Sequence, residues 1–222
     1  MWAALLVLFL GVQRPEAFCD STVDLSPLKV CFKAQSDLKS ISADFTQTRA
    51  LKTLKSPIAV KGHFWFAAPD QFRWQLGDPP KTIIIGAKDA SIVIHPSLKH
   101  AEKSTLSTSG SFPSQKVFEM MGLSGKRTLE EFQKHMHVLA LKRSGSRCHL
   151  EMLPKDPSAT RGLSSINIDF DSETGQWLDF EIVTREGSSI RTELNNVRTN
   201  SVIAREVFDY DLSGFIVGHE KK

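Results

Sequence analysis

The sequence predicts a mainly β fold with a few helices, in which an antiparallel sheet curls around an apolar face. Short segments with alternating apolar and polar residues recur along the chain, about ten in all, with turn residues between them. Nearly all have one apolar and one polar face, which is typical of an antiparallel sheet that is wet on one side. Because a sheet of about ten strands tends to curl, the few helices would form a thin lid over a hydrophobic cavity or a filled core.

The chain begins with a helix and a strand. Ser26 is a suitable N-cap residue, and Pro27 suits the first turn of a helix. Apolar residues then recur at helical spacing, so the sequence predicts an amphipathic helix over residues 26–41. Residues 43–54 are typical of a strand, with Phe45 facing inward.

The strongest strand signal runs from Val60 to Trp74. Alternation places Val60, Phe64 and Phe66 on one face of a strand. After a turn, Phe72 and Trp74 share one face of the next strand. The sheet therefore has an aromatic surface that helices must cover or an apolar ligand must occupy. We expect Arg73 to be an exposed charge on the opposite face.

The middle of the chain predicts further strands. An Ile-rich strand over residues 81–86 is followed by a turn, a strand over 91–95 and a short strand near 99–103. Residues 106–113 are rich in Ser, Thr and Gly and predict a mobile loop.

Two short helices are expected next. Val117 to Met121, followed by Gly122, is typical of a helix with a glycine stop, and Thr128 is suited to cap a helix over residues 129–134.

The last third predicts strands again. Residues 135–142 and 147–153 form a hairpin around Ser144 and Gly145. This register places four side chains on one face, namely Leu139, Leu141, Cys148 and Leu150.

Three further strands complete the pattern. Apolar residues alternate with polar ones from Ile166 to Phe170 and from Leu178 to Ile182, and a more polar strand spans 190–198. The turn over 171–175 joins the first two. Asp179 and Glu181 lie on the polar face, so we expect both to be solvated.

Composition narrows the class of protein. The chain has 222 residues, 41% of them hydrophobic, which is enough for a core, and a net charge of +3 without a long basic run. Nucleic acid is therefore not an expected partner.

The N-terminus carries an apolar run from Trp2 to Val12. This run is too short to span a bilayer, because a membrane-spanning helix needs roughly 20 residues. We expect residues 1–19 to be a secretory signal and residues 20–222 to be one domain; an uncleaved anchor and a lipid on Cys19 are the alternatives. Cys31 and Cys148 then remain, either as a disulfide in an oxidising compartment or as two buried free thiols.

Catalytic and metal signatures are not found in the sequence. It contains no Gly-x-Ser-x-Gly motif and no glycine-rich phosphate loop. His135 and His137 alternate along a predicted strand, but zinc-ligand spacing is missing, so we expect no metal and no catalytic residue. The prediction is a protein that is not an enzyme and uses no cofactor.

Several motifs stand in a defined order along the chain. The first two are Ser42-Ala43-Asp44-Phe45-Thr46-Gln47-Thr48 and Gly62-x-Phe64-x-Phe66-x-x-Pro69-x-x-Phe72-Arg73-Trp74. They are followed by His95-Pro96, Leu150-x-Met152-Leu153-Pro154-Lys155, the 171–176 turn and Thr192-x-Leu194-x-Asn196. In order and spacing, these motifs resemble the LolA family of periplasmic lipoprotein carriers.

The resemblance implies an incomplete antiparallel β-barrel closed by a helical lid. It also implies a monomeric periplasmic carrier that accepts acylated lipoprotein cargo from an inner-membrane ABC-type complex, shields the acyl chains, and delivers them to an outer-membrane receptor. Carried over residue by residue, the cavity lining would be Phe45, Phe64, Phe66, Phe72, Trp74, Ile84, Leu150, Ile168 and Phe180.

The chain departs from the family pattern at several positions. Many carriers have an Arg before the proline corresponding to Pro69, whereas this chain has Ala68. This departure motivates an alternative, a carrier of another lipid or glycolipid on the same fold. A non-enzymatic structural protein of the cell envelope is a second alternative, and it predicts a filled core.

Overall fold

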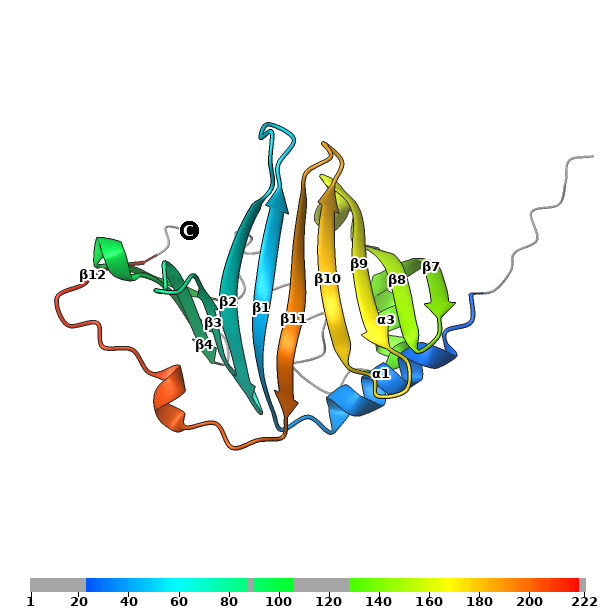
Figure 1. Cartoon of the computed structure of the whole chain (residues 1–222), viewed down its shortest axis with the longest axis horizontal. Coiled ribbons are helices and arrows are strands. Elements are labelled where there is room, and N and C mark those ends of the chain that lie inside the picture. Colours follow the sequence, from blue (N-terminus) through cyan, green and yellow to red (C-terminus); the bar gives the residue numbers. More distant parts are fainter. Residues whose placement is uncertain (1–22, 88–89, 106–127, 220–222) are drawn as a thin grey trace, which may run out of the picture.

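The computed structural model describes residues 23–87, 90–105 and 128–219. Twelve strands form one sheet in the order β12-β6-β5-β4-β3-β2-β1-β11-β10-β9-β8-β7. The strand pairs are antiparallel except that β12 runs parallel to β6. The sheet is strongly curled but not closed, with β12 and β7 at its two edges (Figure 1). This is the predicted fold class.

The strands are β1 (Ser40–Ala50), β2 (Ile58–Ala67), β3 (Gln71–Leu76), β4 (Thr82–Ala87), β5 (Ala90–His95), β6 (His100–Thr105), β7 (Met136–Ser144), β8 (Arg147–Pro154), β9 (Leu163–Asp171), β10 (Trp177–Thr184), β11 (Ser189–Thr199) and β12 (Ile216–His219). The described helices are α1 (Ser26–Ser36), α3 (Leu129–His135) and α4 (Pro157–Thr160), with short 3-10 helices η1 (Pro96–Leu98) and η2 (Arg205–Phe208).

Helix α1 ends earlier than its apolar spacing predicts. The backbone N–H of Asp37 bonds to the carbonyl oxygens of Lys33 and Gln35, which closes the last turn, and β1 begins at Ser40. The predicted extension to residue 41 is wrong because the segment after Lys39 gains two strand partners, β2 and β11. The N-cap is Leu25, not Ser26.

Helix α3 confirms its predicted start. The Thr128 hydroxyl accepts a hydrogen bond from Glu131 N–H, and the Glu131 carboxylate accepts one from Thr128 N–H, which is a capping box. The helix includes His135, which was expected in a strand. The loop predicted over 106–113 and the helix predicted over 117–122 lie outside the described residues.

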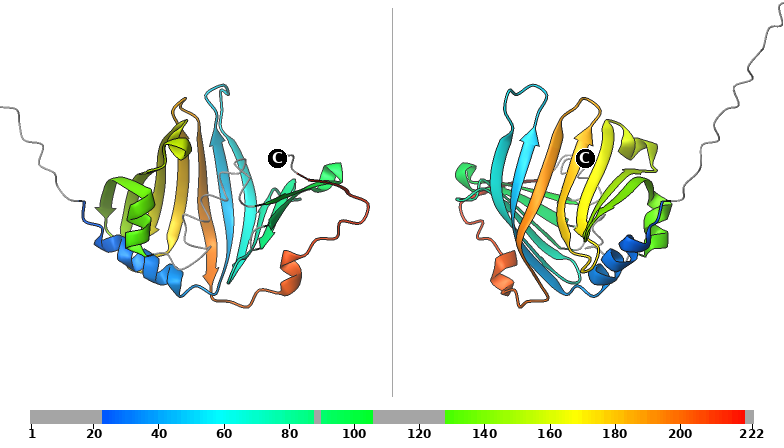
Figure 2. Two further views of the ribbon diagram at one scale, coloured as in Figure 1. Left: turned by 180° about the vertical axis from the view of Figure 1, so that it is seen from behind. Right: turned by 45° about the vertical axis from the view of Figure 1, so that its right-hand side comes forward.

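The main hydrophobic cluster lies on one face of the sheet, here called the inner face. Buried side chains of α1 and α3 form one cluster there with side chains of nearly every strand from β1 to β10. Phe32 of α1 and Phe132 of α3 have ring centroids 5.3 Å apart. Figure 2 shows both helices at the end of the sheet formed by β7, β8 and β9.

A second cluster lies on the opposite, outer face of β4, β5 and β6. Ile83, Ile94 and Ala101 are fully buried there beneath Tyr210, Leu212 and Phe215. We call residues 205–215 the C-terminal strap; it continues from β11 towards β12 at the sheet edge (Figure 1). The strands β4 and β5 are thus apolar on both faces, contrary to the one-sided pattern expected of them.

The strap also changes the environment of Arg73. Its Nη1 donates hydrogen bonds to the carbonyl oxygens of Val207, at 3.0 Å, and Asp209, at 3.5 Å. Its guanidinium carbon lies 5.8 Å from the centroid of the Trp65 ring. Arg73 is therefore half-buried, and the expectation of an exposed charge is wrong.

Two register shifts correct the predicted faces. Pairing of β7 with β8 shifts between Val138 and Ala140, so Leu139 is 48% exposed, whereas Leu141, Cys148 and Leu150 face inward as expected. Pairing of β10 with β9 shifts between Trp177 and Asp179, and Trp177 packs on the main cluster in place of Leu178.

Candidate functional site

The centre of the inner face is a stack of aromatic rings. Phe45 and Trp74 have ring centroids 4.0 Å apart and nearly parallel planes, and Phe64 lies 5.7 Å from Trp74 at a steeper angle. Gly62 of β2 makes this stack possible, because a Cβ atom there would overlap the Phe45 ring.

The structure brings all nine predicted lining residues into this one cluster. Eight are buried and Phe72 is partly buried. Two of them, Leu150 and Ile168, border a small cavity of about 20 Å³ beneath α1. A cavity of that size holds about one water molecule. Its walls are Leu28, Cys31, Phe32, Gln35, Phe132, Leu150, Ile168, Phe170 and Trp177.

A larger cavity, which we call the α1 cavity, opens beside the C-terminal end of α1. It measures about 340 Å³ and shares Gln35 and Trp177 with the small cavity. Its apolar wall contains Leu38, Ile41, Trp177 and Leu194. The remaining residues around it are Ala34, Gln35, Thr174, Gly175, Gln176, Thr199 and Asn200. The cavity thus has both apolar and hydrogen-bonding walls.

Sequence reasoning missed the walls of the α1 cavity. Leu38 and Ile41 had been assigned to a helix, and Leu194 served only as part of a family motif. The cavity joins α1, the start of β1, the β9–β10 turn and β11, which are distant in the chain. No local pattern could have assembled them.

Gly175 determines how closely α1 approaches the sheet. Its φ is +73°, and a Cβ atom there would lie 2.8 Å from the Val30 carbonyl oxygen and 2.9 Å from the Ala34 Cβ. The turn that carries it is held by Asp171, whose Oδ1 accepts hydrogen bonds from the N–H groups of Glu173 and Thr174. Hydrogen bonds, first from the Thr174 backbone, lower the pKa of Asp171 to about 2. Glycine is needed here because both the conformation and the space exclude a side chain.

Cys31 and Cys148 are both buried free thiols in this structure. Burial, and secondly the neighbouring Cys148, raises the pKa of the Cys31 thiol to about 12. At neutral pH Cys31 is therefore protonated and a poor nucleophile.

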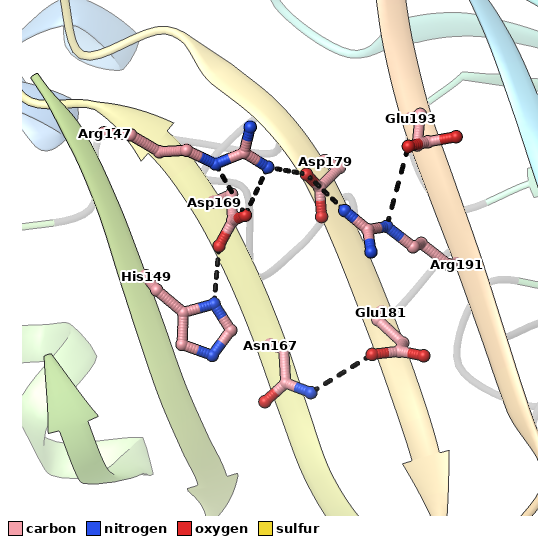
Figure 3. Close-up of polar contacts among 8 residues, drawn as sticks. All are labelled: Arg147, His149, Asn167, Asp169, Asp179, Glu181, Arg191 and Glu193. Atoms are coloured by element: carbon pink, nitrogen blue, oxygen red, sulfur yellow. Dashed lines mark hydrogen bonds and ion pairs between the residues drawn. The ribbon is translucent and has the colours of Figure 1, made fainter. Parts of the chain in front are cut away.

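The outer face of β8 to β11 carries a chain of charged side chains, which we call the polar ladder (Figure 3). Arg147 lies between two carboxylates and bonds to Asp169 and to Asp179, the latter at 2.7 Å. Arg191 donates to Asp179 at 3.1 Å, and the His149 ring hydrogen-bonds to Asp169. Asp179 is only 7% exposed, so the expectation that it is solvated is wrong.

The pKa values of two carboxyl groups of the ladder, Asp169 and Asp179, are shifted in opposite directions. Burial would raise the pKa of Asp169, but hydrogen bonds from Arg147 and His149 outweigh it and lower the pKa below its usual value. Burial, and then repulsion from Asp169, raises the pKa of Asp179 despite Arg191 and Arg147.

Within the described ranges, no group of three or more His, Cys, Asp and Glu side chains is arranged to hold a metal ion. Across the same ranges, no helix combines the length and the apolar character needed to cross a bilayer. Residues 1–22, with the predicted signal, are not among those described.

Comparison with solved structures finds similar chains of very different sequence. An uncharacterized conserved protein from Thermus thermophilus aligns with a TM-score of 0.54 and 7% identity, over 87% of this chain and 97% of the other. A LolA superfamily protein from Nitrosomonas europaea gives 0.43 and 10%, over 86% and 99%. The MucA/MucB complex of Pseudomonas aeruginosa gives 0.46 and 12%, over 85% and 62%.

Comparison with curated proteins finds no match. A family model described as outer membrane lipoprotein carrier protein LolA matches residues 36–211, which is most of the chain. This match confirms the resemblance that the strand motifs indicated. The chain belongs to the LolA family.

Proposed function

We propose that this protein is a periplasmic carrier that binds the acyl chains of lipoproteins and transfers them from the inner to the outer membrane. The observation that carries the proposal is the α1 cavity, with an apolar wall and polar groups beside it. Membership of the LolA family supports the same assignment. The activity is binding and release, so no covalent bond is made or broken and the protein is not an enzyme.

The size and walls of the α1 cavity suit part of an acyl chain. Its volume of about 340 Å³ lies at the lower end of ligand pockets, which measure roughly 300–1,000 Å³. Each methylene that leaves water contributes about 0.8 kcal/mol to binding. Gln176 and the side-chain amide nitrogen of Asn200 offer hydrogen-bonding groups for the ester or peptide part of an acylated cargo, while Asn200 Oδ1 already accepts from Lys39 N–H at 2.7 Å.

The predicted lining residues extend this site when α1 moves. Ile41 belongs both to the α1 cavity and to the main hydrophobic cluster, which contains all nine of them. Outward movement of α1 would therefore open a path from the α1 cavity towards Phe45 and Phe64. In this proposal α1 is the lid, and the nine residues are the walls of the enlarged cavity.

The proposal includes the compartment and the partners. Residues 1–19 direct the chain across the inner membrane and are removed. The mature monomer receives its cargo from an ABC-type complex in the inner membrane and delivers it to an outer-membrane receptor.

A carrier of another lipid or glycolipid is the second candidate. Ala68 stands where many carriers have an Arg, and its backbone N–H donates to the Lys39 carbonyl oxygen at 2.8 Å. Any residue other than proline can make this backbone contact at position 68, so the difference from those carriers is the missing Arg side chain, which hydrogen-bonds the lid in them. A change in how the lid is held favours a change of cargo. A structural envelope protein without a ligand is the remaining outcome of the test.

The first test is native mass spectrometry of the protein purified gently from the periplasm of its own host. Co-purified acylated lipoprotein supports the carrier, and a free lipid or glycolipid supports the second candidate. An empty protein that also refuses added lipoprotein contradicts both.

A pair of variants tests the α1 cavity itself. Leu194→Trp fills the cavity, so it should weaken binding of a fluorescent acylated peptide by at least about tenfold, since several methylenes lose their site. Leu139→Trp is the control because Leu139 is exposed on β7. Equal affinities in two variants with intact circular dichroism spectra would place the acyl chain elsewhere.

A further inference from the structure

The hairpin that joins β1 and β2 ends in an exposed apolar tip. Leu51, Leu54 and Ile58 are 38%, 44% and 48% exposed. Leu54 N–H donates to the Leu51 carbonyl oxygen at 2.9 Å, so both leucines flank a tight turn. Strand pairing ends at Arg49 and Ile58, and the tip projects beyond the sheet (Figure 1). We call residues 50–58 the hairpin tip.

Basic side chains surround this apolar tip. Residues 49–61 contain Arg49, Lys52, Lys55 and Lys61, all exposed, and no Asp or Glu. Elsewhere in the chain, positive and negative residues are mixed, and the net charge is only +3. Among the described strand connections, no other combines three exposed aliphatic side chains with several cations and no carboxylate.

The tip is held in place by a neighbouring turn. Lys52 N–H donates to the Ser188 hydroxyl at 3.2 Å, which ties the hairpin tip to the β10–β11 connection. The apolar and basic groups are therefore presented by an anchored turn at one end of the sheet. Exposed apolar side chains that form a contiguous patch with a polar rim mark protein or membrane interaction sites, whereas singly scattered ones do not.

We propose that the hairpin tip docks on the surface of a membrane that contains anionic phospholipids. Leu51, Leu54 and Ile58 enter the boundary between headgroups and acyl chains, while Lys52 and Lys55 contact the lipid phosphates. Charge complementarity favours this occupant, because the tip carries only positive charge and the membrane surface is negative. The tip is separate from the α1 cavity, so docking does not depend on cargo binding.

Vesicle co-flotation of the purified full protein tests this docking. Vesicles of phosphatidylethanolamine and phosphatidylglycerol should carry the protein, whereas pure phosphatidylcholine should carry much less, and added salt should weaken the binding. Lys52→Gln with Lys55→Gln should lower the partition coefficient about 25-fold, because each lysine near an anionic surface contributes about fivefold. Leu51→Ser with Leu54→Ser should lower it by about tenfold for each leucine.

Matched controls lie away from the tip. Lys134→Gln removes an exposed lysine of α3, and Val202→Ser removes the most exposed aliphatic side chain of the described residues. Every variant keeps the same N-terminus, so that segment contributes equally to all of them. All variants should retain the acyl-peptide affinity of the parent, which separates this test from that of the proposed carrier function.

A direct contact is measured with Leu54→Trp. Bromine-labelled anionic lipids should quench the new tryptophan. Absence of quenching, equal flotation of tip and control variants, or lack of binding to anionic vesicles overturns the proposal. Tip-dependent capture by an acidic protein without vesicle binding also overturns it, in favour of a protein partner.

Discussion

The outer face of this curled sheet is built differently in its two halves. Over β4, β5 and β6 it is apolar, and the C-terminal strap covers Ile83 and Ile94, both 0% exposed. Over β8 to β11 it carries the polar ladder of paired charges, with the side chains of Arg147 and Arg191 about half exposed. The same sheet thus uses a covering segment in one half and a salt-bridge network in the other.

The difference shows how a strand without an alternating pattern should be interpreted. Ile83, Ile84 and Ile85 follow one another in β4, and Ile92, Val93 and Ile94 do so in β5. A continuous apolar run is typical of a strand buried on both faces, which requires a layer on each side. In β9, by contrast, polar residues alternate with apolar ones and the outer side chains pair with one another.

The largest expected loss of stability comes from a substitution in the half of the outer face that the C-terminal strap covers. Ile94→Ala should reduce the free energy of unfolding by about 3 kcal/mol, because it leaves a hole beneath the strap. Leu139→Ala, at an exposed position on β7, should change it by less than about 0.5 kcal/mol. Urea unfolding measures both, and equal costs would mean that the strap does not bury the outer face.

Substitutions in the polar ladder should reduce the free energy of unfolding by less than Ile94→Ala does, and the size of the reduction should depend on pH. Asp169→Asn should reduce the free energy of unfolding by about 2 kcal/mol at neutral pH. Breaking a fully buried ion pair costs roughly 3–5 kcal/mol, and the loss is smaller here because Arg147 is half exposed. The pKa of Asp169 is lowered in the folded state, so its stabilisation is present above the ordinary carboxyl pKa of about 3.9 and is lost as the pH falls through the lowered value.

Asp179→Asn should show the opposite trend. Since the folded-state pKa of Asp179 is raised, its favourable contribution is present at low pH and declines as the pH rises through that value. Unfolding at several pH values should therefore show a smaller cost at neutral pH for this variant than for Asp169→Asn. The control is Asn167→Ala, which removes a long 3.4 Å contact to Glu181. If the stability of the two Asp variants depended on pH in the same way, the opposite pKa shifts of Asp169 and Asp179 would be contradicted.

The smallest expected effect concerns the attachment of the strap. Arg73→Gln should cost about 1 kcal/mol, because it removes the hydrogen bonds to the Val207 and Asp209 carbonyl oxygens. Amide exchange within residues 205–215 should accelerate, while exchange in β8 to β11 stays unchanged. Arg143→Gln, on the β7–β8 turn, serves as the control. Faster exchange in both regions would show that the strap and the sheet open together.

Local patterns were sufficient for most strands and for the start of α3, whereas the N-cap of α1 and the short helix α4 were not predicted. The aromatic pair β2 and β3, the capping box at Thr128 and the turn at Asp171 each depend on neighbouring residues, so they could be predicted. The nine residues that the family resemblance implies as cavity lining belong to one cluster. Their role as cavity walls stays a prediction.

The sequence by itself determined the period of each strand and hence which side chains share a face, because alternation is a property of the strand alone. Only the tertiary structure decided what covers each face. The strap over Ile94, the burial of Asp179 between two arginines and the α1 cavity all join segments far apart in the chain. The exposure of Leu139 depends on the pairing register of β7 with β8. Such contacts depend on how the whole sheet curls and shifts its register, and the period of a single strand carries no information about that.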